Sequence, residues 1–192
     1  IQFIMDYKKL DFIAAVRHLA QANGIEVKET ELSPAEKEKK EAIETYHKLS
    51  ERAAAQYVNE AWKIIKAEED EHPAFNQLYR FSEEAIVQWR IGYAPDEWKF
   101  LYNKIKDLGL VDPAEKAGIL SLKNSNYFDT FRNRVIFPIH NKKGRVCGFG
   151  GRVLDAKDNP KYLNTKSTDI FNKSQELYGL YFAKDTIRRT ET

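Results

Sequence analysis

Between Phe131 and Phe182, arginines and lysines recur beside glycines. Such cations can neutralise phosphate groups, and an arginine can clamp a phosphate through two hydrogen-bond donors. A glycine in a strand lets a ligand approach the backbone closely. Tyr162 follows Lys161 directly and could stack on a nucleic-acid base. These residue types fit contact with a nucleic acid or nucleotide, and the alternative is a hairpin with ordinary solvated charges.

Two strand-like runs must position these residues. The runs 135–139 and 145–149 flank the polar, glycine-containing turn 141–144. Apolar β-type runs on both sides of such a turn are typical of a β-hairpin. We therefore predict that 134–139 pairs with 145–150 in an antiparallel hairpin.

The positive charge is concentrated in the same part of the chain. The net charge is only +2 over 192 residues. Residues 131–192 hold 13 Lys/Arg against 6 Asp/Glu, whereas residues 1–130 hold 18 against 23. A basic C-terminal third behind a mildly acidic helical part is the electrostatic pattern expected for polyanion binding.

The preceding two-thirds is predicted to be mainly helical. Asp11 can cap a helix over 10–23, whose predicted apolar face is Phe12, Ile13, Val16, Leu19 and Ala20. Ser82 can cap a second helix, with Ile86 and Trp89 facing inward. A third is predicted over about 96–108, with Trp98, Leu101, Ile105 and Leu108 on one face.

A longer helix is predicted between these segments. Ser33-Pro34-Ala35-Glu36 is a strong start signal, and the helical pattern runs to about Glu71, where Pro73 would end it. Its apolar stripe could be a coiled-coil face, a face for a partner or the side that lies on the protein's own core. We favour the core, because tertiary packing is what mainly holds helices in proteins.

Catalytic motifs are missing from the sequence. The carboxylates of the β-rich half, Asp155, Asp158 and Asp169, are scattered and form no D-x-D pair for a catalytic metal. We find no P-loop, nucleophile elbow or HExxH, and His140 has no evident partner that would make it a general base. The single Cys147 excludes an internal disulfide and a cysteine-rich zinc site, and we interpret it as a small buried hydrophobe. No apolar run could span a membrane, so a protein of a reducing cytoplasm without membrane contact is expected.

Five short sequence motifs, which follow one another in a fixed order, are far more specific evidence of a protein family than any of these features. They read FR-x-R-V-I-F-P-I, G-R-V-x-G-F-G-G-R-V-L, P-K-Y-L-N, D-I-F-N-K and L-Y-G-L-Y, and a turn I-G-Y-A-P precedes them at 91–95. In this order they closely resemble the catalytic core of DnaG-type bacterial DNA primases. The resemblance covers nearly the whole chain and is densest over 91–182. Two departures are Thr130, where many relatives carry Arg, and 77–81, which lacks an Arg-Gly pair common there.

The resemblance implies an α+β fold, in which N-terminal helices and a long linker helix precede a mixed α/β subdomain with a mainly antiparallel sheet. It implies that 1–27 is the end of a zinc-binding domain, 28–72 a linker with the long helix, and 73–192 the N-terminal subdomain of the RNA polymerase core. A fragment is expected, since the chain lacks an initiator Met. The zinc ligands would lie upstream, and the Toprim acids that hold Mg or Mn would follow Thr192. The fragment itself is expected to bind no cofactor and to hold no catalytic or metal-binding residue.

The function implied by the resemblance is that of a replicative primase, which synthesises RNA primers on a single-stranded DNA template from nucleoside triphosphates. A replicative helicase would bind through parts absent here. By position in the matching blocks, the residues expected to line the groove for template and nucleotide are Arg132, Arg134, Arg152, Lys161, Tyr162, Asn164 and Lys173. The alternative is a stand-alone module of primase-like fold that binds single-stranded nucleic acid or a protein and has no polymerase activity.

Overall fold

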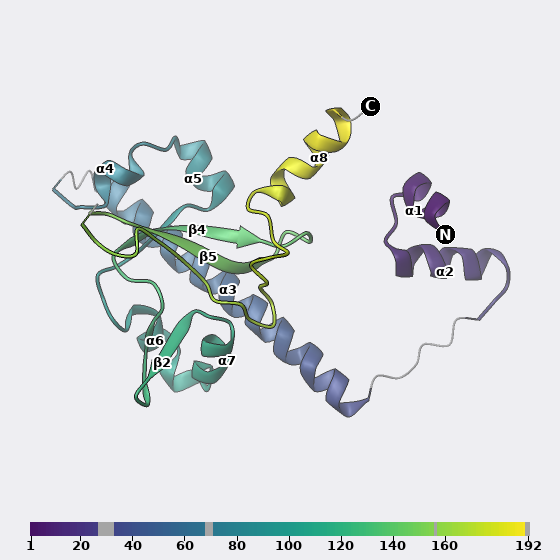
Figure 1. Cartoon of the computed structure of the whole chain (residues 1–192), viewed down its shortest axis with the longest axis horizontal. Coiled ribbons are helices and arrows are strands. Elements are labelled where there is room, and N and C mark those ends of the chain that lie inside the picture. The colour runs from purple at the N-terminus through teal and green to yellow at the C-terminus, as the bar shows by residue number, and fades with distance from the viewer. Residues whose placement is uncertain (27–32, 68–70, 156, 191–192) are drawn as a thin grey trace. The chain divides into compact units, whose positions relative to one another are not determined.

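The β-type runs of the basic segment form the predicted hairpin at the centre of a four-stranded sheet. In the computed structural model, β4 (Arg134–His140) pairs antiparallel with β5 (Val146–Val153), and Phe137 lies opposite Gly150. The register shifts between Ile139 and His140. On the outer sides lie β1 (Gly92–Ala94) and β6 (Tyr162–Asn164), so that the strand order is β1-β4-β5-β6. Figure 1 shows β4 and β5 side by side.

The structure describes residues 1–26, 33–67, 71–155 and 157–190. They divide into two units, 1–38 and 39–192, and each is described by itself. A second hairpin of the larger unit joins two short strands, β2 (Leu120–Lys123) and β3 (Asn126–Asp129). The shorter helices after residue 71 are α4 (Phe75–Leu78), α5 (Glu83–Trp89), α6 (Phe100–Ile105), the 3-10 turn η1 (Lys106–Leu108), α7 (Val111–Lys116) and α8 (Leu180–Thr190).

The first unit contains α1 (Gln2–Lys8), which the sequence did not predict, and α2 (Phe12–Ala22). The predicted cap is confirmed, because the Ala14 N–H donates to the Asp11 carboxylate at 2.8 Å. The residues of the predicted apolar face lie in α2 but differ in exposure. Phe12 and Ile13 are 57% and 63% exposed, and the buried residues of α2 are Ala15 and Ala20.

The long helix α3 (Pro34–Lys66) starts as predicted. The Ser33 N–H donates to the Glu36 carboxylate at 2.8 Å, and the Glu36 N–H donates back to Ser33 Oγ. Its stripe lies in the protein's own core, where Tyr46, Leu49, Ala53 and Tyr57 are buried. The predicted end is too late, since α3 stops at Lys66 and part of the expected extension, 68–70, lies outside the described residues. Pro73 sets only an upper limit for the helix, because a proline disfavours helical geometry in the residue before it.

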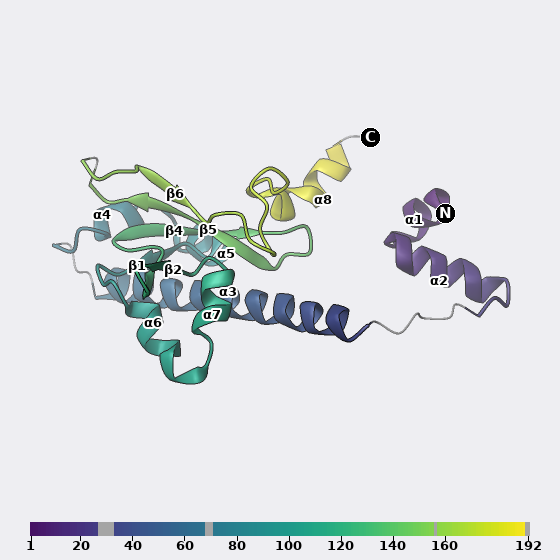
Figure 2. The same ribbon diagram turned by 60° about the horizontal axis from the view of Figure 1, so that its bottom comes forward.

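The α3 helix covers one face of the sheet and approaches β1 very closely (Figure 2). A Cβ atom at Gly92 would lie 2.6 Å from Tyr57 Cβ, so only glycine fits there without a shift. The Tyr57 ring meets Phe149 edge-on at 5.7 Å between centroids. On the other face of the sheet, Val135 packs with Ile86 of α5.

Polar contacts fix the same helix to β5. Glu51 accepts a hydrogen bond from the Val146 N–H at 2.8 Å, and His47 Nδ1 lies 2.9 Å from the Val146 carbonyl oxygen. The second Glu51 oxygen pairs with the Arg90 guanidinium. Burial opposes ionisation of Glu51, but these partners outweigh it and hold the carboxyl pKa below its ordinary value of 4.5.

The segment before β2 departs from the predicted helix over 96–108. Only 100–105 is α-helical, and Asp129 fixes its start by accepting hydrogen bonds from the Leu101 and Tyr102 N–H groups at 2.7 and 3.0 Å. Trp98 and Leu108, which were predicted to share a helix face with Leu101, are 60% and 61% exposed, whereas Leu101 is buried. They lie outside the α-helical turns, so the helical period does not apply to them.

Replacing Glu51 by alanine should destabilise the fold by about 1–3 kcal/mol at pH 7, because the buried Val146 N–H loses its acceptor. The stabilisation belongs to a carboxyl whose pKa is lowered by folding. It is therefore present above pH 4.5 and lost as the pH falls through the lower folded value. The free energies of unfolding of Glu51→Ala and the parent, measured with urea, should differ at pH 7 and become equal in acid. The control is Glu41→Ala, an exposed position of α3, and equal costs for both variants would contradict the assignment.

Candidate nucleic-acid interface

The face of the sheet opposite α3 brings three of the predicted site residues together. Alternate strand residues share a face, so Gly150 and Arg152 of β5 point away from Phe149 and α3. The register places Asn164 beside Gly150 and Tyr162 beside Arg152. A Cβ at Gly150 would lie 3.2 Å from the Asn164 side-chain oxygen, so the glycine leaves room for this amide.

Two cations flank the Tyr162 ring, which is 57% exposed. The Arg152 guanidinium carbon lies 5.8 Å and Lys161 Nζ 5.9 Å from the ring centroid. These distances are at the outer limit of cation–π contact. The arrangement joins an exposed aromatic face, on which a base could stack, to two positive charges that phosphates could neutralise.

Arg134 occupies a different place from its neighbours in the predicted set. It is only 8% exposed, and its Nη1 donates to the Pro160 carbonyl oxygen at 2.9 Å. Burial lowers the pKa of its guanidinium, and the charge of Asp158 opposes that effect. Arg134 therefore supports the segment just before Lys161 from within the protein, and a direct contact with nucleic acid stays a prediction.

The last two cations of the set also differ in setting. Arg132 pairs with the Asp96 carboxylate, and its guanidinium carbon lies 4.3 Å from the centroid of the Trp98 ring. Lys173 is exposed in the turn after Phe171. The Phe171 ring packs over Gly148, where a Cβ would stand 3.1 Å away, so this turn lies at the Gly148 end of the open face. Lys173 is thus available to an anion, whereas Arg132 is already paired with Asp96 at the surface.

Sequence reasoning missed Thr165, which orients β6. Its hydroxyl accepts from the Phe149 N–H at 2.9 Å, and its own N–H donates to the Phe149 carbonyl oxygen at 2.9 Å. This buried residue extends the pairing of β5 and β6 beyond Asn164. A single threonine after a short polar segment carries no signal in the sequence that would reveal this role.

His140, the one candidate general base considered from the sequence, is packed inside the protein. His140 is 8% exposed and meets Phe182 edge-on at 5.0 Å. Burial and the Arg90 charge lower its pKa, although Glu51 acts the other way. Cys147 is fully buried, as predicted, and burial raises the pKa of its thiol to about 12.

In the ranges that the structure describes, no helix is both long and apolar enough to cross a bilayer.

Comparison with known proteins places this fold. A family model described as the DNA primase catalytic core, N-terminal domain, matches residues 60–184. The chain belongs to this family. Curated DNA primases of Myxococcus xanthus and Escherichia coli strain K12 are 33% and 37% identical to it over 191 residues, or 98% and 96% of the chain. The chain spans only 30% and 31% of the length of those primases.

Solved primase structures agree with this assignment. A DnaG primase catalytic domain bound to ssDNA is 36% identical, with a TM-score of 0.67 over 76% of this chain and 45% of that one. The RNA polymerase domain of Mycobacterium tuberculosis DnaG in complex with double-stranded DNA is 28% identical, with a TM-score of 0.67 over 76% and 46%. These likenesses confirm the predicted α+β fold of the DnaG primase core.

The role of Arg134 in this primase domain can be tested by replacing it with methionine, which keeps the apolar stem and removes the donor to Pro160. We expect the segment before Lys161 to loosen, because its carbonyl loses a charged partner. The Val153 N–H, which donates to the Lys161 carbonyl at 3.2 Å, should then exchange its hydrogen faster. The control is Lys142→Ala in the β4–β5 turn, which should leave hydrogen exchange at Val153 unchanged. Unchanged exchange at Val153 in Arg134→Met would contradict the supporting role.

Proposed function

We propose that this chain is the template-holding part of a replicative DNA primase, an enzyme that makes short RNA primers on single-stranded DNA. The observation that carries the proposal is the exposed Tyr162 ring flanked by Arg152 and Lys161 at the β5–β6 end of a primase-core sheet, on the face opposite α3. A related DnaG catalytic domain has been solved with ssDNA bound, which supports the choice of ligand.

In this proposal each residue has a separable task. Lys161 and Arg152 neutralise template phosphates, and Tyr162 stacks on a base without selecting it. Asn164, beside Gly150, offers amide donors and an acceptor to a nucleotide or a backbone oxygen. Lys173 extends the positive charge toward the Gly148 end of the face, and Arg134 keeps the Lys161 segment in place.

The catalytic metal is assigned to another part of the primase. Nucleotidyl transfer by a primase needs a divalent ion held by clustered carboxylates. Among the residues that the structure describes, no three His, Cys, Asp or Glu side chains are grouped to hold a metal, so the donor set fits neither Mg or Mn nor zinc. We infer that a Toprim domain supplies the former and a zinc-binding domain the latter. A replicative helicase would likewise bind elsewhere, and the complete enzyme would act in the cytoplasm.

The domain boundaries form part of the same proposal. We assign 1–27 to the end of the zinc-binding domain, 28–72 to the linker with the long helix, and 73–192 to the N-terminal subdomain of the polymerase core. The likeness to Aquifex aeolicus primase, solved with its zinc-binding and RNA polymerase domains, supports this order, since it covers 98% of the chain at 26% identity and a TM-score of 0.65.

The template contacts predict distinct effects on binding to a short labelled oligothymidylate, followed by fluorescence anisotropy across a salt series. Lys161→Ala should lower the slope of log affinity against log salt by about one, because one phosphate contact is lost. Tyr162→Ala should cost about 1–3 kcal/mol of binding energy with little change in slope. Lys142→Ala, in the exposed hairpin turn, is the matched control. If Lys161→Ala and Lys142→Ala lower the affinity for oligothymidylate equally, the positive charge acts without specific contacts, and the groove assignment is wrong.

The division of labour predicts that the isolated chain makes no primers. With nucleoside triphosphates, a single-stranded template and Mg or Mn, no dinucleotide should form, because the proposed metal carboxylates belong to another domain. Product analysis on denaturing gels would check this. Template-dependent dinucleotide synthesis by the purified chain would overturn the domain assignment, whereas failure to bind DNA would favour a protein-interaction module instead.

A further inference from the structure

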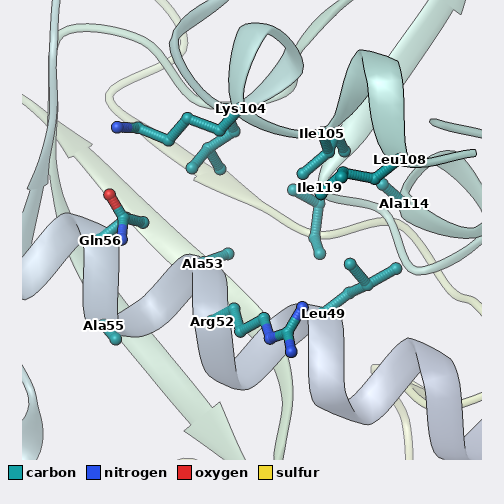
Figure 3. Close-up of a pocket in the computed structure, with 11 residues that line it drawn as sticks. Leu49, Arg52, Ala53, Ala55, Gln56, Lys104, Ile105, Leu108, Ala114 and Ile119 are labelled. Atoms are coloured by element: carbon teal, nitrogen blue, oxygen red, sulfur yellow. The ribbon is translucent and has the colours of Figure 1, made fainter. Parts of the chain in front are cut away.

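A hollow lies in the larger unit between α3 and the segment from α6 to β2. Its volume is about 230 Å³, and its walls are mainly aliphatic. Figure 3 shows Leu49 of α3 pointing toward Ile105 and Ile119 across the hollow, with Ala53 and Ala114 at its walls. Leu108, which is 61% exposed, extends this apolar surface to the edge. We call this hollow the α3–α6 pocket.

The rim of the α3–α6 pocket is cationic. Arg52 of α3 and Lys104 of α6 are its only charged lining residues, and both are exposed (Figure 3). Within the part of the chain that the structure describes, neither of them makes an ion pair with a carboxylate. Gln56 adds a neutral amide beside them. The Lys104 ammonium lies 4.8 Å from the centroid of the Phe100 ring, a contact that leaves its charge unneutralised. An apolar hollow with two such cations at its edge is complementary to an apolar group that carries negative charge next to it.

The size of the pocket favours a side chain over a whole small molecule. Sites for small molecules usually enclose about 300–1,000 Å³, which is more than this pocket holds. A single leucine or phenylalanine side chain fits such a hollow, and one buried apolar anchor is the usual centre of a protein interface. Carboxylates beside that anchor would meet Arg52, which can bind them through two donors, and Lys104.

We propose that the α3–α6 pocket binds an acidic peptide segment of a partner protein, with one large apolar side chain in the hollow and neighbouring carboxylates on Arg52 and Lys104. This site goes beyond the template-holding function. The helix α3 covers the face of the sheet that carries Phe149, whereas Arg152 and Tyr162 lie on the other face (Figure 2). A peptide in the pocket therefore leaves the DNA-binding face open.

The test uses the intact chain and a fluorescein-labelled peptide, Gly-Asp-Glu-Phe-Asp-Gly, in an anisotropy titration. Arg52→Gln and Lys104→Gln should each weaken binding about two- to fivefold, as expected for exposed ion pairs. A peptide with Ala for Phe should lose about tenfold or more, because the anchor is gone. Lys39→Gln makes the same charge change at an exposed position of α3 outside the pocket and should leave binding unchanged.

The remaining outcomes decide against the proposal. Absence of peptide binding, or equal weakening by Lys39→Gln, would show that the pocket is not the site. Labelled oligothymidylate should bind Arg52→Gln and Lys104→Gln as well as it binds the parent. If these variants weaken oligothymidylate as much as Lys161→Ala does, the rim serves nucleic acid and the peptide proposal is wrong. If Lys161→Ala weakens oligothymidylate binding and the two pocket variants do not, DNA binds at the template face and the pocket remains a separate site, as proposed.

Discussion

The close approach of Gly92 to Tyr57 sets the distance between α3 and the sheet, and the remaining contacts of the larger unit depend on it. A side chain at position 92 would overlap both the Tyr57 side chain and its backbone. At this distance the Tyr57 ring reaches Phe149, and Glu51 reaches the backbone of Val146. Because α3 is held so tightly on one face, the β5–β6 end of the opposite face is left for ligands, and the hollow beside α6 takes its shape from the same helix.

Strand parity explains why two arginines of one hairpin have different tasks. Arg134 lies opposite Val153 in the β4–β5 register, on the face of the sheet that α3 covers. Its guanidinium therefore remains inside the protein, where it donates to the Pro160 carbonyl oxygen. Arg152 lies one position before Val153 and on the other face, beside Tyr162. A shift of β5 by one residue relative to β4 would bring Arg152 to the same face as Arg134. The binding face and its internal support are thus produced together by one hairpin.

Local signals in the sequence predicted what depends on local geometry. The helix starts at Asp11 and Ser33 and the hairpin turn were foreseen because caps and turns are formed by residues close in sequence. The exposure of Trp98 was not foreseen, because periodicity cannot show where a helix begins when a distant residue, Asp129, fixes its first N–H groups. The candidate site was predicted as a set of residues. Its division into exposed and internal members depends on burial, which one sequence does not reveal.

Positive charge alone does not identify a partner, and this chain presents it in two distinct settings. At Tyr162 the cations surround an exposed, flat ring, which matches a stack of bases with phosphates at regular spacing. At the α3–α6 pocket the cations stand beside a mainly aliphatic hollow, whose size matches a single apolar side chain. The apolar component of each surface, rather than its charge, therefore distinguishes a nucleic acid from a peptide. Since the two surfaces lie on opposite sides of the same helix–sheet pair, the proposed template site and the proposed peptide site do not overlap.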